Sequence, residues 1–282
     1  MKLRRYPTQA EWDKIVALGP GVRNYRGKKT LFYNGEKLYE GDWYDGELLI
    51  YDYKERQSWE VIIVLPGVEV IPEYTFYYCR NIKVVIMTDS VQRIEESAFQ
   101  GCKSLDFVRL SRNLEYIGIT VFFGCYSLTS IYIPPSCREI DNEAFHGCRK
   151  LIILSIPPHT QLGYNVIADT ALIKISTFET NEHGYYDSVS DTTEVNAWIK
   201  SINDSDGLAL HRICSSDNPD REQVYGYMKD HGVRAMKLPN SIGITPSQYL
   251  AANPYSEIDE VGLIKRYVLE RMGEVVQGQV QI

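Results

Sequence analysis

The feature that most limits how this chain can fold is a 23-residue repeat in its middle part. Phenylalanine recurs at that interval, at Phe76, Phe99, Phe122 and Phe145. Cysteine recurs three positions later in each copy, at Cys79, Cys102, Cys125 and Cys148. A unit of this length cannot bury its own apolar side, so successive units must stack and share one core. The repeat therefore predicts a solenoid.

Each copy also contains a short apolar pattern of the form L-x-x-L-x-L. Two of these sets are Leu105, Val108, Leu110 and Leu128, Ile131, Ile133, and the series begins at Trp59, Ile62 and Val64. Alternate residues of a strand point to one face, so the pattern indicates short strands whose inward side chains fill the core. Strands of successive turns are expected to pair in parallel.

The written-out turns resemble a known repeat family. The segments Glu96–Leu105 and Asn142–Cys148, each with Ala-Phe-x-Gly-Cys at its centre, are similar to the BspA-type leucine-rich repeat, which is common in bacterial surface proteins and in protists. The resemblance covers about residues 59–178 and implies binding and adhesion roles. Two departures stand at its ends: Tyr78 replaces the motif's glycine, and the last turn, 165–172, is one residue short.

Residues on both sides of the solenoid are expected to close its ends, which makes the predicted fold class α+β. Residues 1–58 suggest a short helix ending near Gly19, followed by β-hairpins that form a β-rich N-terminal cap. The acidic, Ser/Thr-rich composition of the stretch 179–194 suggests a mobile linker. A calcium loop is not expected there, because the acids lack the spacing and the glycine of such loops.

The C-terminal part, residues 195–276, has a helical pattern. Ala209–Cys214, a second helix that ends in Gly232, and a following Gly-x-Thr-Pro entry resemble an ankyrin repeat, although the spacing is 37 residues instead of the usual 33. Thr245 is the expected N-cap and Pro246 the first helical residue. A closing amphipathic helix is predicted from the apolar positions Ile258, Val261, Ile264, Val268 and Met272, and residues 277–282 form a polar tail.

Charge and composition exclude several classes of protein. The net charge of −7 argues against a nucleic-acid binder, which normally presents a basic field to phosphates. The first thirteen residues have no apolar run typical of a secretory signal, and no segment reaches the length of a membrane span. With the 6 cysteines expected to be reduced, a cytoplasmic or nuclear location is predicted.

No catalytic or cofactor motif is recognisable in the sequence. It has no phosphate-binding glycine loop, no H-E-x-x-H and no C-x-x-C, so that no metal or cofactor is predicted. The cysteine column is better explained by small buried side chains than by a metal or redox site. His211 falls where ankyrin repeats place a histidine that bonds to the local backbone. We therefore expect a protein that is not an enzyme.

The candidate binding surface is the outward side of the predicted strands. Its columns are largely apolar or aromatic, and a contiguous exposed apolar patch usually marks a contact site. The expected partner-binding residues are Val84, Ile86, Phe107, Arg109, Tyr132 and Ile153. The alternative is that the chain's own termini cover these columns. The sequence thus favours an interaction scaffold for an unidentified protein; a surface adhesion protein, or an enzyme with an unrecognised site, are the alternatives.

Overall fold

The chain forms two compact units. The computed structural model describes residues 9–18, 29–35, 43–44, 47–48, 57–186, 188–204, 207–216 and 218–278. The first unit extends from Met1 to Lys200 and the second from Ser201 to Ile282. This division lies beyond the predicted linker, so residues 179–194 belong to the first unit.

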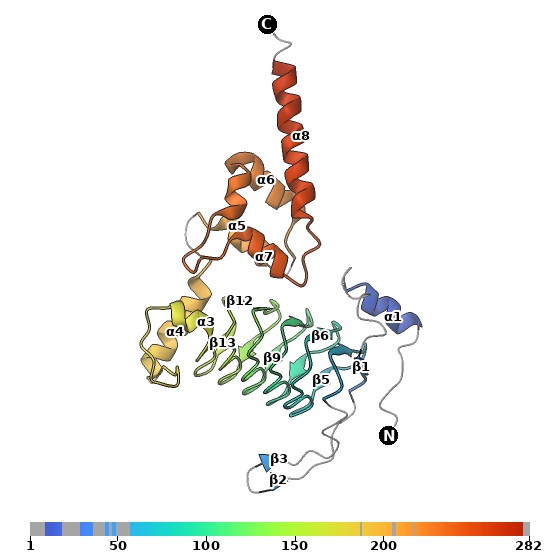
Figure 1. Cartoon of the computed structure of the whole chain (residues 1–282), viewed down its shortest axis with the longest axis vertical. Helices are drawn as coiled ribbons and strands as arrows, with labels where there is room; N and C mark the ends of the chain where they lie inside the picture. Colours follow the sequence, from blue (N-terminus) through green and yellow to red (C-terminus); the bar gives the residue numbers. More distant parts are fainter. Residues whose placement is uncertain are drawn as a thin grey trace. The chain divides into compact units, whose positions relative to one another are not determined.

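The first unit is a solenoid with one main strand in each coil (Figure 1). The main strands are β4 (Val61–Val64), β6 (Val84–Met87), β8 (Phe107–Arg109), β10 (Ser130–Tyr132) and β12 (Ile153–Ser155). They run parallel, and Val61 pairs with Val84, which in turn pairs with Phe107. This register equals the 23-residue spacing in the sequence. The predicted parallel-strand solenoid and α+β fold class are confirmed.

A second parallel sheet lies on the other side of each coil. It contains β5 (Val70–Ile71), β7 (Arg93–Ile94), β9 (Tyr116–Ile117), β11 (Glu139–Ile140) and β13 (Gln161–Leu162), in the order β13-β11-β9-β7-β5. Its isoleucines at 71, 94, 117 and 140 are fully buried. Glu139 pairs with Gln161, only 22 positions further on, which is the shortened last turn expected from the sequence. This second sheet was not predicted.

Stacked phenylalanine rings run through the core of the solenoid. The ring centroids of Phe76 and Phe99 are 5.0 Å apart, and those of Phe99 and Phe122 and of Phe122 and Phe145 are 5.5 Å apart. All four rings are fully buried. Offset stacking of this kind adds to the stability that area burial alone provides. Each coil therefore contributes one ring to a continuous column, as the repeat predicted.

The turn after each phenylalanine has a left-handed backbone. Gly101, Gly124 and Gly147 have φ between 68° and 72°, a region that glycine enters without steric cost. Tyr78 has the same conformation, with φ of 54°, in the first copy. The departure from the motif therefore changes the residue but leaves the shape of the turn intact.

The N-terminal end continues the solenoid. Strand β1 (Thr30–Tyr33) pairs in parallel with β4, so that Thr30 lies beside Val61. We predicted hairpins here; this prediction is wrong for β1, which is one more parallel strand. Between β1 and β4 in the sequence, β2 (Trp43–Tyr44) and β3 (Glu47–Leu48) do form an antiparallel pair. Helix α1 (Gln9–Val16) is the predicted N-terminal helix.

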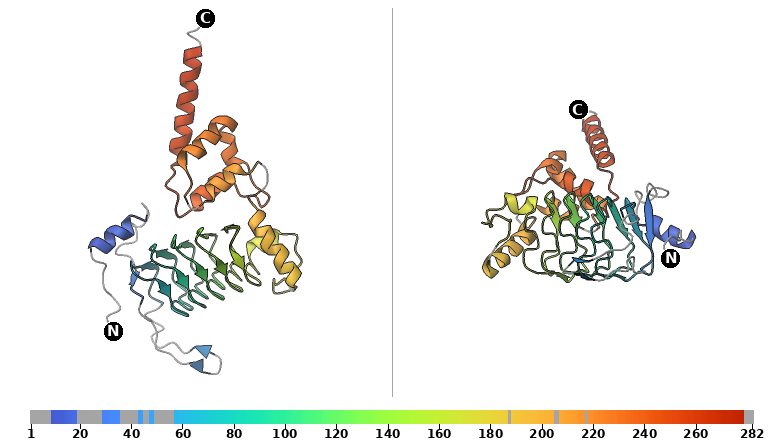
Figure 2. Two further views of the ribbon diagram at one scale, coloured as in Figure 1. Left: turned by 180° about the vertical axis from the view of Figure 1, so that it is seen from behind. Right: turned by 60° about the horizontal axis from the view of Figure 1, so that its bottom comes forward.

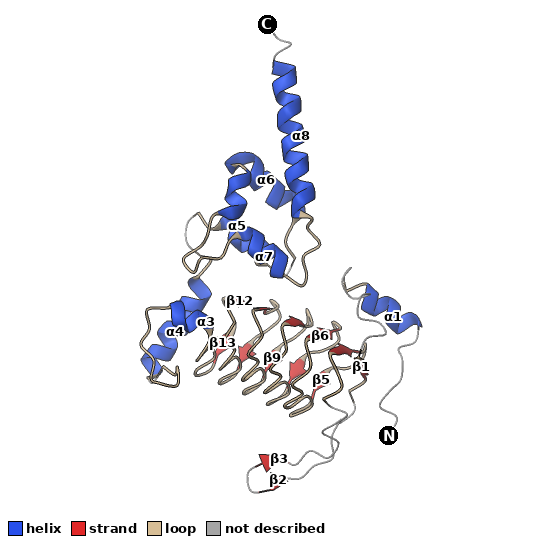
Figure 3. Cartoon of the chain, in the orientation of Figure 1, coloured by secondary structure: helices blue, strands red, loops and turns tan. Residues whose placement is uncertain are grey.

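Helices close the other end of the solenoid (Figure 3). Helix α3 (Ala171–Ile175) is capped by Thr170, and α4 (Val189–Ser201) begins inside the segment predicted to be a mobile linker. That prediction is wrong over α4. Asn196 donates to the carbonyl of Leu162, and Lys200 donates to that of Thr160. These bonds satisfy backbone groups at the sheet edge, which would otherwise be open to pairing.

The second unit is helical. It contains α5 (Ala209–Cys214), α6 (Arg221–His231), the 3₁₀ helix η2 (Val233–Lys237), α7 (Pro246–Ala252) and α8 (Glu260–Gly278). Thr245 caps α7 and forms a capping box with Gln248, as the sequence indicated. His211 Nε2 lies 3.2 Å from the carbonyl oxygen of Ile244.

Helix α8 differs from the predicted closing helix. Val261, Val268 and Met272, which were expected to pack, are exposed, whereas Leu263 is fully buried. The helix also continues beyond Gly273 into the predicted tail, and residues 279–282 lie outside the described part of the chain. No helix among the described residues is long and apolar enough to cross a bilayer.

Candidate functional site

The candidate surface, here called the outer strand face, consists of the outward side chains of the main strands. These are residues 61, 63, 84, 86, 107, 109, 130, 132, 153 and 155. The structure buries five of the six predicted contact residues: the exposed fractions are 8% for Val84, 1% for Ile86, 3% for Arg109, 2% for Tyr132 and 8% for Ile153. Phe107 is half-buried. The expectation that these residues form an exposed patch is therefore wrong for all but Phe107.

Helix α1 covers the N-terminal part of this face. Trp12 and Ile15 belong to one buried cluster with Val61, Val84 and Ile86. Figure 2 shows the helix at the β1 end of the solenoid. The ring of Trp12 also meets that of Phe32 edge-on, at a centroid distance of 6.2 Å. The self-coverage considered as the alternative is thus present over the first strands.

The contacts on α1 follow helical spacing. Trp12, Ile15 and the half-buried Val16 stand at positions i, i+3 and i+4, which place them on one side of the helix. Phe107 packs against the edge of the same cluster. Each fully buried anchor stabilises the contact by about 1.5–3 kcal/mol. The outer strand face therefore has the shape and chemistry to receive an amphipathic helix.

Arg109 is a structural cation rather than a contact residue. Its Nη1 donates to the carbonyl oxygen of Met87 at 2.7 Å, to Asp89 Oδ1 at 3.1 Å and to the carbonyl of Leu110 at 3.3 Å. A buried guanidinium must be hydrogen-bonded to offset its desolvation. The hydrogen bonds of Arg109 thus link its coil to the preceding one. The position of Arg109 on the strand gave no indication of these bonds.

The face becomes more polar towards the C-terminal coils. Ser130 and Ser155 are partly exposed, in contrast to the buried Val61 and Ile63 at the same positions in earlier coils. The outward columns are therefore fully apolar only where α1 lies on them. That gradient, together with the apolar positions of α1, was a sequence signal for self-coverage that the prediction did not use.

The repeat cysteines are not a reactive site. Cys102, Cys125 and Cys148 are fully buried, and each thiol donates to the carbonyl of a phenylalanine in the preceding coil, at 3.1–3.3 Å. Burial raises the pKa of Cys125 well above that of a free thiol, so the reactive thiolate is suppressed. The structural interpretation of this column is confirmed.

No group of three or more metal-binding side chains occurs among the residues that the structure describes. His146 packs against aromatic rings. His146 is stacked against Phe123 at 4.6 Å and lies near Tyr185 at 4.5 Å. Burial lowers its pKa, with a smaller contribution from Arg149 against an opposing one from Asp169, so the imidazole is held neutral.

Comparison with known families finds a similarity for the solenoid. The family model described as "BspA type Leucine rich repeat region" matches in 6 copies over residues 69–193. Residues 69–193 are therefore similar to BspA-type leucine-rich repeat regions. The ankyrin resemblance of the second unit lies outside this BspA-type match and stays a prediction. No match was found among curated proteins.

Solved structures similar to the BspA-type region come from bacteria. A leucine rich cell surface protein from Faecalibacterium prausnitzii is 34% identical over 36% of this chain and 27% of its own, with a TM-score of 0.35. The T. pallidum leucine rich repeat protein is 20% identical over 47% of this chain and 86% of its own, with a TM-score of 0.28. A leucine-rich repeat protein from Bacteroides capillosus is 26% identical over 48% and 80%, with a TM-score of 0.30. The chain thus spans about a quarter of the length of the first of these proteins.

Proposed function

We propose that this chain is a non-catalytic protein-interaction module whose outer strand face binds an amphipathic helix of a partner protein. The observation that carries the proposal is the seating of α1: Trp12 and Ile15 are buried in one apolar cluster with Val84 and Ile86, so the face already holds a helix. Repeat solenoids present extended surfaces of this kind to partners. A helix laid on an apolar surface by anchors at i, i+3 and i+4 is a recurring mode of recognition.

In this proposal α1 and the partner compete for the same residues. Helix α1 is only 8 residues long, and helices of that length are marginal on their own in water. Its seat is made chiefly of apolar contacts, which a partner helix with the same spacing can replace. Val84 and Ile86 then become contact residues once α1 leaves, whereas Phe107 at the edge is accessible beforehand. Tyr132 and Ile153, which the sequence also suggested, stay proposed contacts of secondary weight, whereas Arg109 is engaged within the stack.

The proposal is tested with a helix supplied in trans. In a full-length Trp12→Ala/Ile15→Ala variant, α1 loses both buried anchors. A fluorescently labelled peptide with the sequence Gln9–Leu18 should then bind the variant and raise its fluorescence anisotropy. The same peptide should not bind the wild-type chain, because its own α1 occupies the face.

A matched pair of substitutions locates the site. Val84→Asp, added to the double variant, should abolish peptide binding, because it places a carboxylate in the apolar seat. Val70→Asp is the control, because Val70 is exposed on the second sheet. Peptide that fails to bind a folded double variant, or binding that is lost equally with Val70→Asp, would show that the face does not receive a helix.

A second candidate function is adhesion at a cell surface. It is supported by the match to the BspA-type region, since that resemblance implies surface and adhesion roles. The comparisons give no support to the cytoplasmic or nuclear location expected from the sequence, which stays a prediction. Fractionation of cells that express a tagged full-length chain, together with protease treatment of the intact cells, decides between the two. Only a protein at the surface is digested by the added protease.

A further inference from the structure

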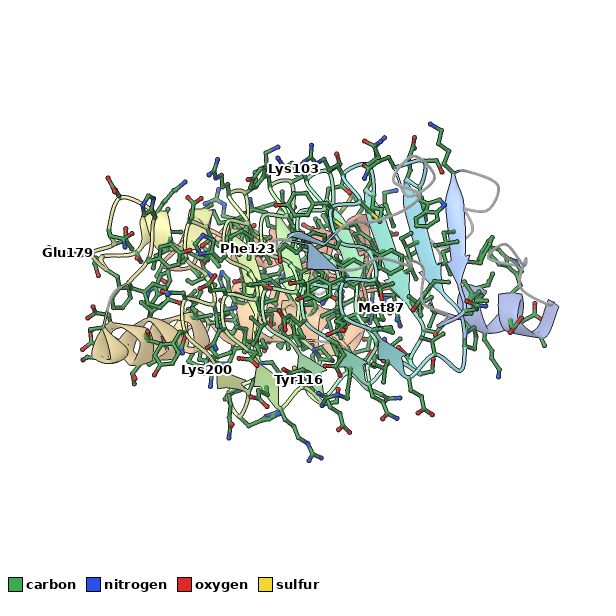
Figure 4. All side chains as sticks on the ribbon, turned by 90° about the horizontal axis from the view of Figure 1, so that it is seen from below. Met87, Lys103, Tyr116, Phe123, Glu179 and Lys200 are labelled. Atoms are coloured by element: carbon green, nitrogen blue, oxygen red, sulfur yellow. The ribbon has the colours of Figure 1, made fainter. Side chains whose placement is uncertain are left out.

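Charge is segregated between the two long sides of the solenoid. Figure 4 shows Lys103 on one long side and Tyr116 on the opposite one. The coil positions that flank Tyr116 and its register partners in the second sheet carry an excess of carboxylates: Glu69, Glu95, Glu115, Glu139 and Asp141, against Arg93 and Arg138. The coil position of Lys103 carries cations instead: Arg80 and Arg149 stand one and two repeats away from it, and Lys103 and Arg149 share the ring of Tyr126, with Asp169 as the carboxylate paired to Arg149. A chain with a net charge of −7 therefore has a local basic field.

Three of these cations are anchored by tyrosine rings. Lys103 and Arg149 both approach Tyr126, with Nζ at 5.2 Å and Cζ at 5.0 Å from the ring centroid. Arg80 lies over the ring of Tyr78 at 5.4 Å. A cation within about 6 Å of a ring is attracted by its electron-rich face. The rings thus restrict long side chains that would otherwise sample many rotamers.

These cations occupy equivalent places in their coils. Residues 80, 103, 126 and 149 differ by the repeat length, so they form one column along the solenoid. Neighbouring coils are about 4.8 Å apart, the ordinary spacing of paired strands. Arg80, Lys103 and Arg149 therefore present a row of positive groups. We call this column, together with Lys150, the basic ridge.

Part of the ridge has no internal counter-ion. Arg149 pairs with Asp169 at 2.8 Å, and Lys174 shares the same carboxylate at 3.3 Å. Within the described ranges, no ion pair neutralises Arg80, Lys103 or Lys150. Unpaired cations held in a row attract a partner of opposite charge and steer its approach.

We propose that the basic ridge docks an acidic peptide segment of a partner protein. An extended segment places carboxylates on one side about every 6.8 Å, and a helix places them about 5–6 Å apart, both within reach of flexible cations spaced by coils. Single-stranded nucleic acid fits less well, because it relies on free aromatic faces for base stacking. Here cations already contact the rings of Tyr78 and Tyr126, and Gly101 lies against the Tyr78 ring.

This surface is separate from the outer strand face, so the two proposals succeed or fail independently. The test uses the full-length protein and a fluorescently labelled polyglutamate peptide at low ionic strength. The peptide should bind and raise the anisotropy, and added salt should release it, since exposed charges are screened. Lys103→Glu should weaken binding by about fivefold or more, because one attraction becomes a repulsion.

Arg138→Glu is the matched control, since it makes the same change in net charge on the acidic side of the solenoid. It should leave peptide affinity within about twofold of wild type. Tyr126→Ala should weaken binding by an intermediate amount, because Lys103 and Arg149 lose the ring that positions them. Circular dichroism reports whether each variant is folded, and Arg80→Glu replaces Lys103→Glu if the latter is not.

Four results would overturn the proposal. Two concern binding itself: polyglutamate that does not bind the wild type, or wild-type affinity in both Lys103→Glu and Arg80→Glu. The other two are equal effects of Lys103→Glu and Arg138→Glu, and tighter binding of a single-stranded oligonucleotide that Lys103→Glu abolishes. The last result would assign the ridge to nucleic acid instead.

Discussion

The thiol of Cys125 donates a hydrogen bond to the backbone carbonyl of Phe99, in the preceding coil, at 3.3 Å. The same relationship joins Cys102 to Phe76 and Cys148 to Phe122. Each turn therefore fastens itself to its neighbour through a buried side chain and a backbone group. The column of cysteines therefore links successive coils of the stack. A prediction about thiol reactivity follows from it.

The cysteines should resist thiol reagents in the folded state. All 6 are buried, and burial raises the pKa of Cys125 and Cys148, so almost no reactive thiolate forms at neutral pH. Absorbance with a disulfide reagent should rise only when the protein is unfolded by denaturant. A Lys150→Cys variant is the positive control, since that side chain is exposed. Prompt reaction of several thiols in the native wild type would contradict the buried column.

Removal of one ring from the phenylalanine column should be strongly destabilising. Phe122 lies between Phe99 and Phe145, each at 5.5 Å, and is fully buried. Phe122→Ala should lower the free energy of unfolding by about 3–5 kcal/mol, through lost burial and the cavity that remains. Denaturant titration measures this. Tyr164→Ala, at a largely exposed ring, should change stability by less than about 0.5 kcal/mol. Similar losses for both would show that the ring column is not the core.

Acid should destabilise the last coils through His146. Its pKa is lowered in the folded state by burial, so folding stabilises the neutral imidazole. The unfolded chain takes up the proton near pH 6.5, so this contribution is complete above that pH and is lost as the pH falls. The unfolding equilibrium should shift by up to about tenfold per pH unit below 6.5. His146→Phe should flatten this dependence when stability is measured from pH 7.5 to 5.5. His159→Phe, at an exposed site, should keep it.

Two glycines should respond to alanine in opposite directions. A Cβ on Gly163 would lie 2.6 Å from the amide nitrogen of Asn142, whereas one on Gly226 in α6 would meet nothing within 4 Å. Gly163→Ala should therefore cost about 1–3 kcal/mol through backbone displacement between coils. Gly226→Ala should stabilise the second unit by about 0.5–1 kcal/mol, because alanine favours the helix interior. Thermal unfolding compares the two; a neutral Gly163→Ala would contradict the close packing of the last coils.

The phenylalanine and cysteine columns of the solenoid could be predicted because their residues recur at a constant interval in the sequence. Phe122 and Cys125 recur at one spacing, and equal spacing is what stacking requires. Strand β1 could not be found in this way, since the paired residues Thr30 and Val61 are 31 positions apart instead of 23. The helix α8 pattern was recognisable, but amphipathic spacing does not say whether a neighbour is present to bury the apolar side.

The candidate site was predicted only in part for a related reason. Alternation along a strand shows which side chains share a face, but it contains no information about what covers that face. Val84 and Ile86 were correctly placed on the outward side, yet they are buried in one cluster with Trp12 and Ile15 of α1, which is far away in the sequence. Arg109 was assigned to a partner because nothing local shows its bonds to Met87 and Asp89.

The most direct test of the helix-receiving face measures how fast a thiol placed under α1 reacts. In a Val84→Cys variant the native cysteines provide a buried reference. When α1 is intact, we predict that the cysteine at position 84 reacts slowly, although its rate should still be much higher than that of the native thiols. We predict rapid labelling when Trp12→Ala and Ile15→Ala are added. Equal rates at position 84 with and without the two anchors would contradict the account, because α1 would then not be the removable cover of the outer strand face.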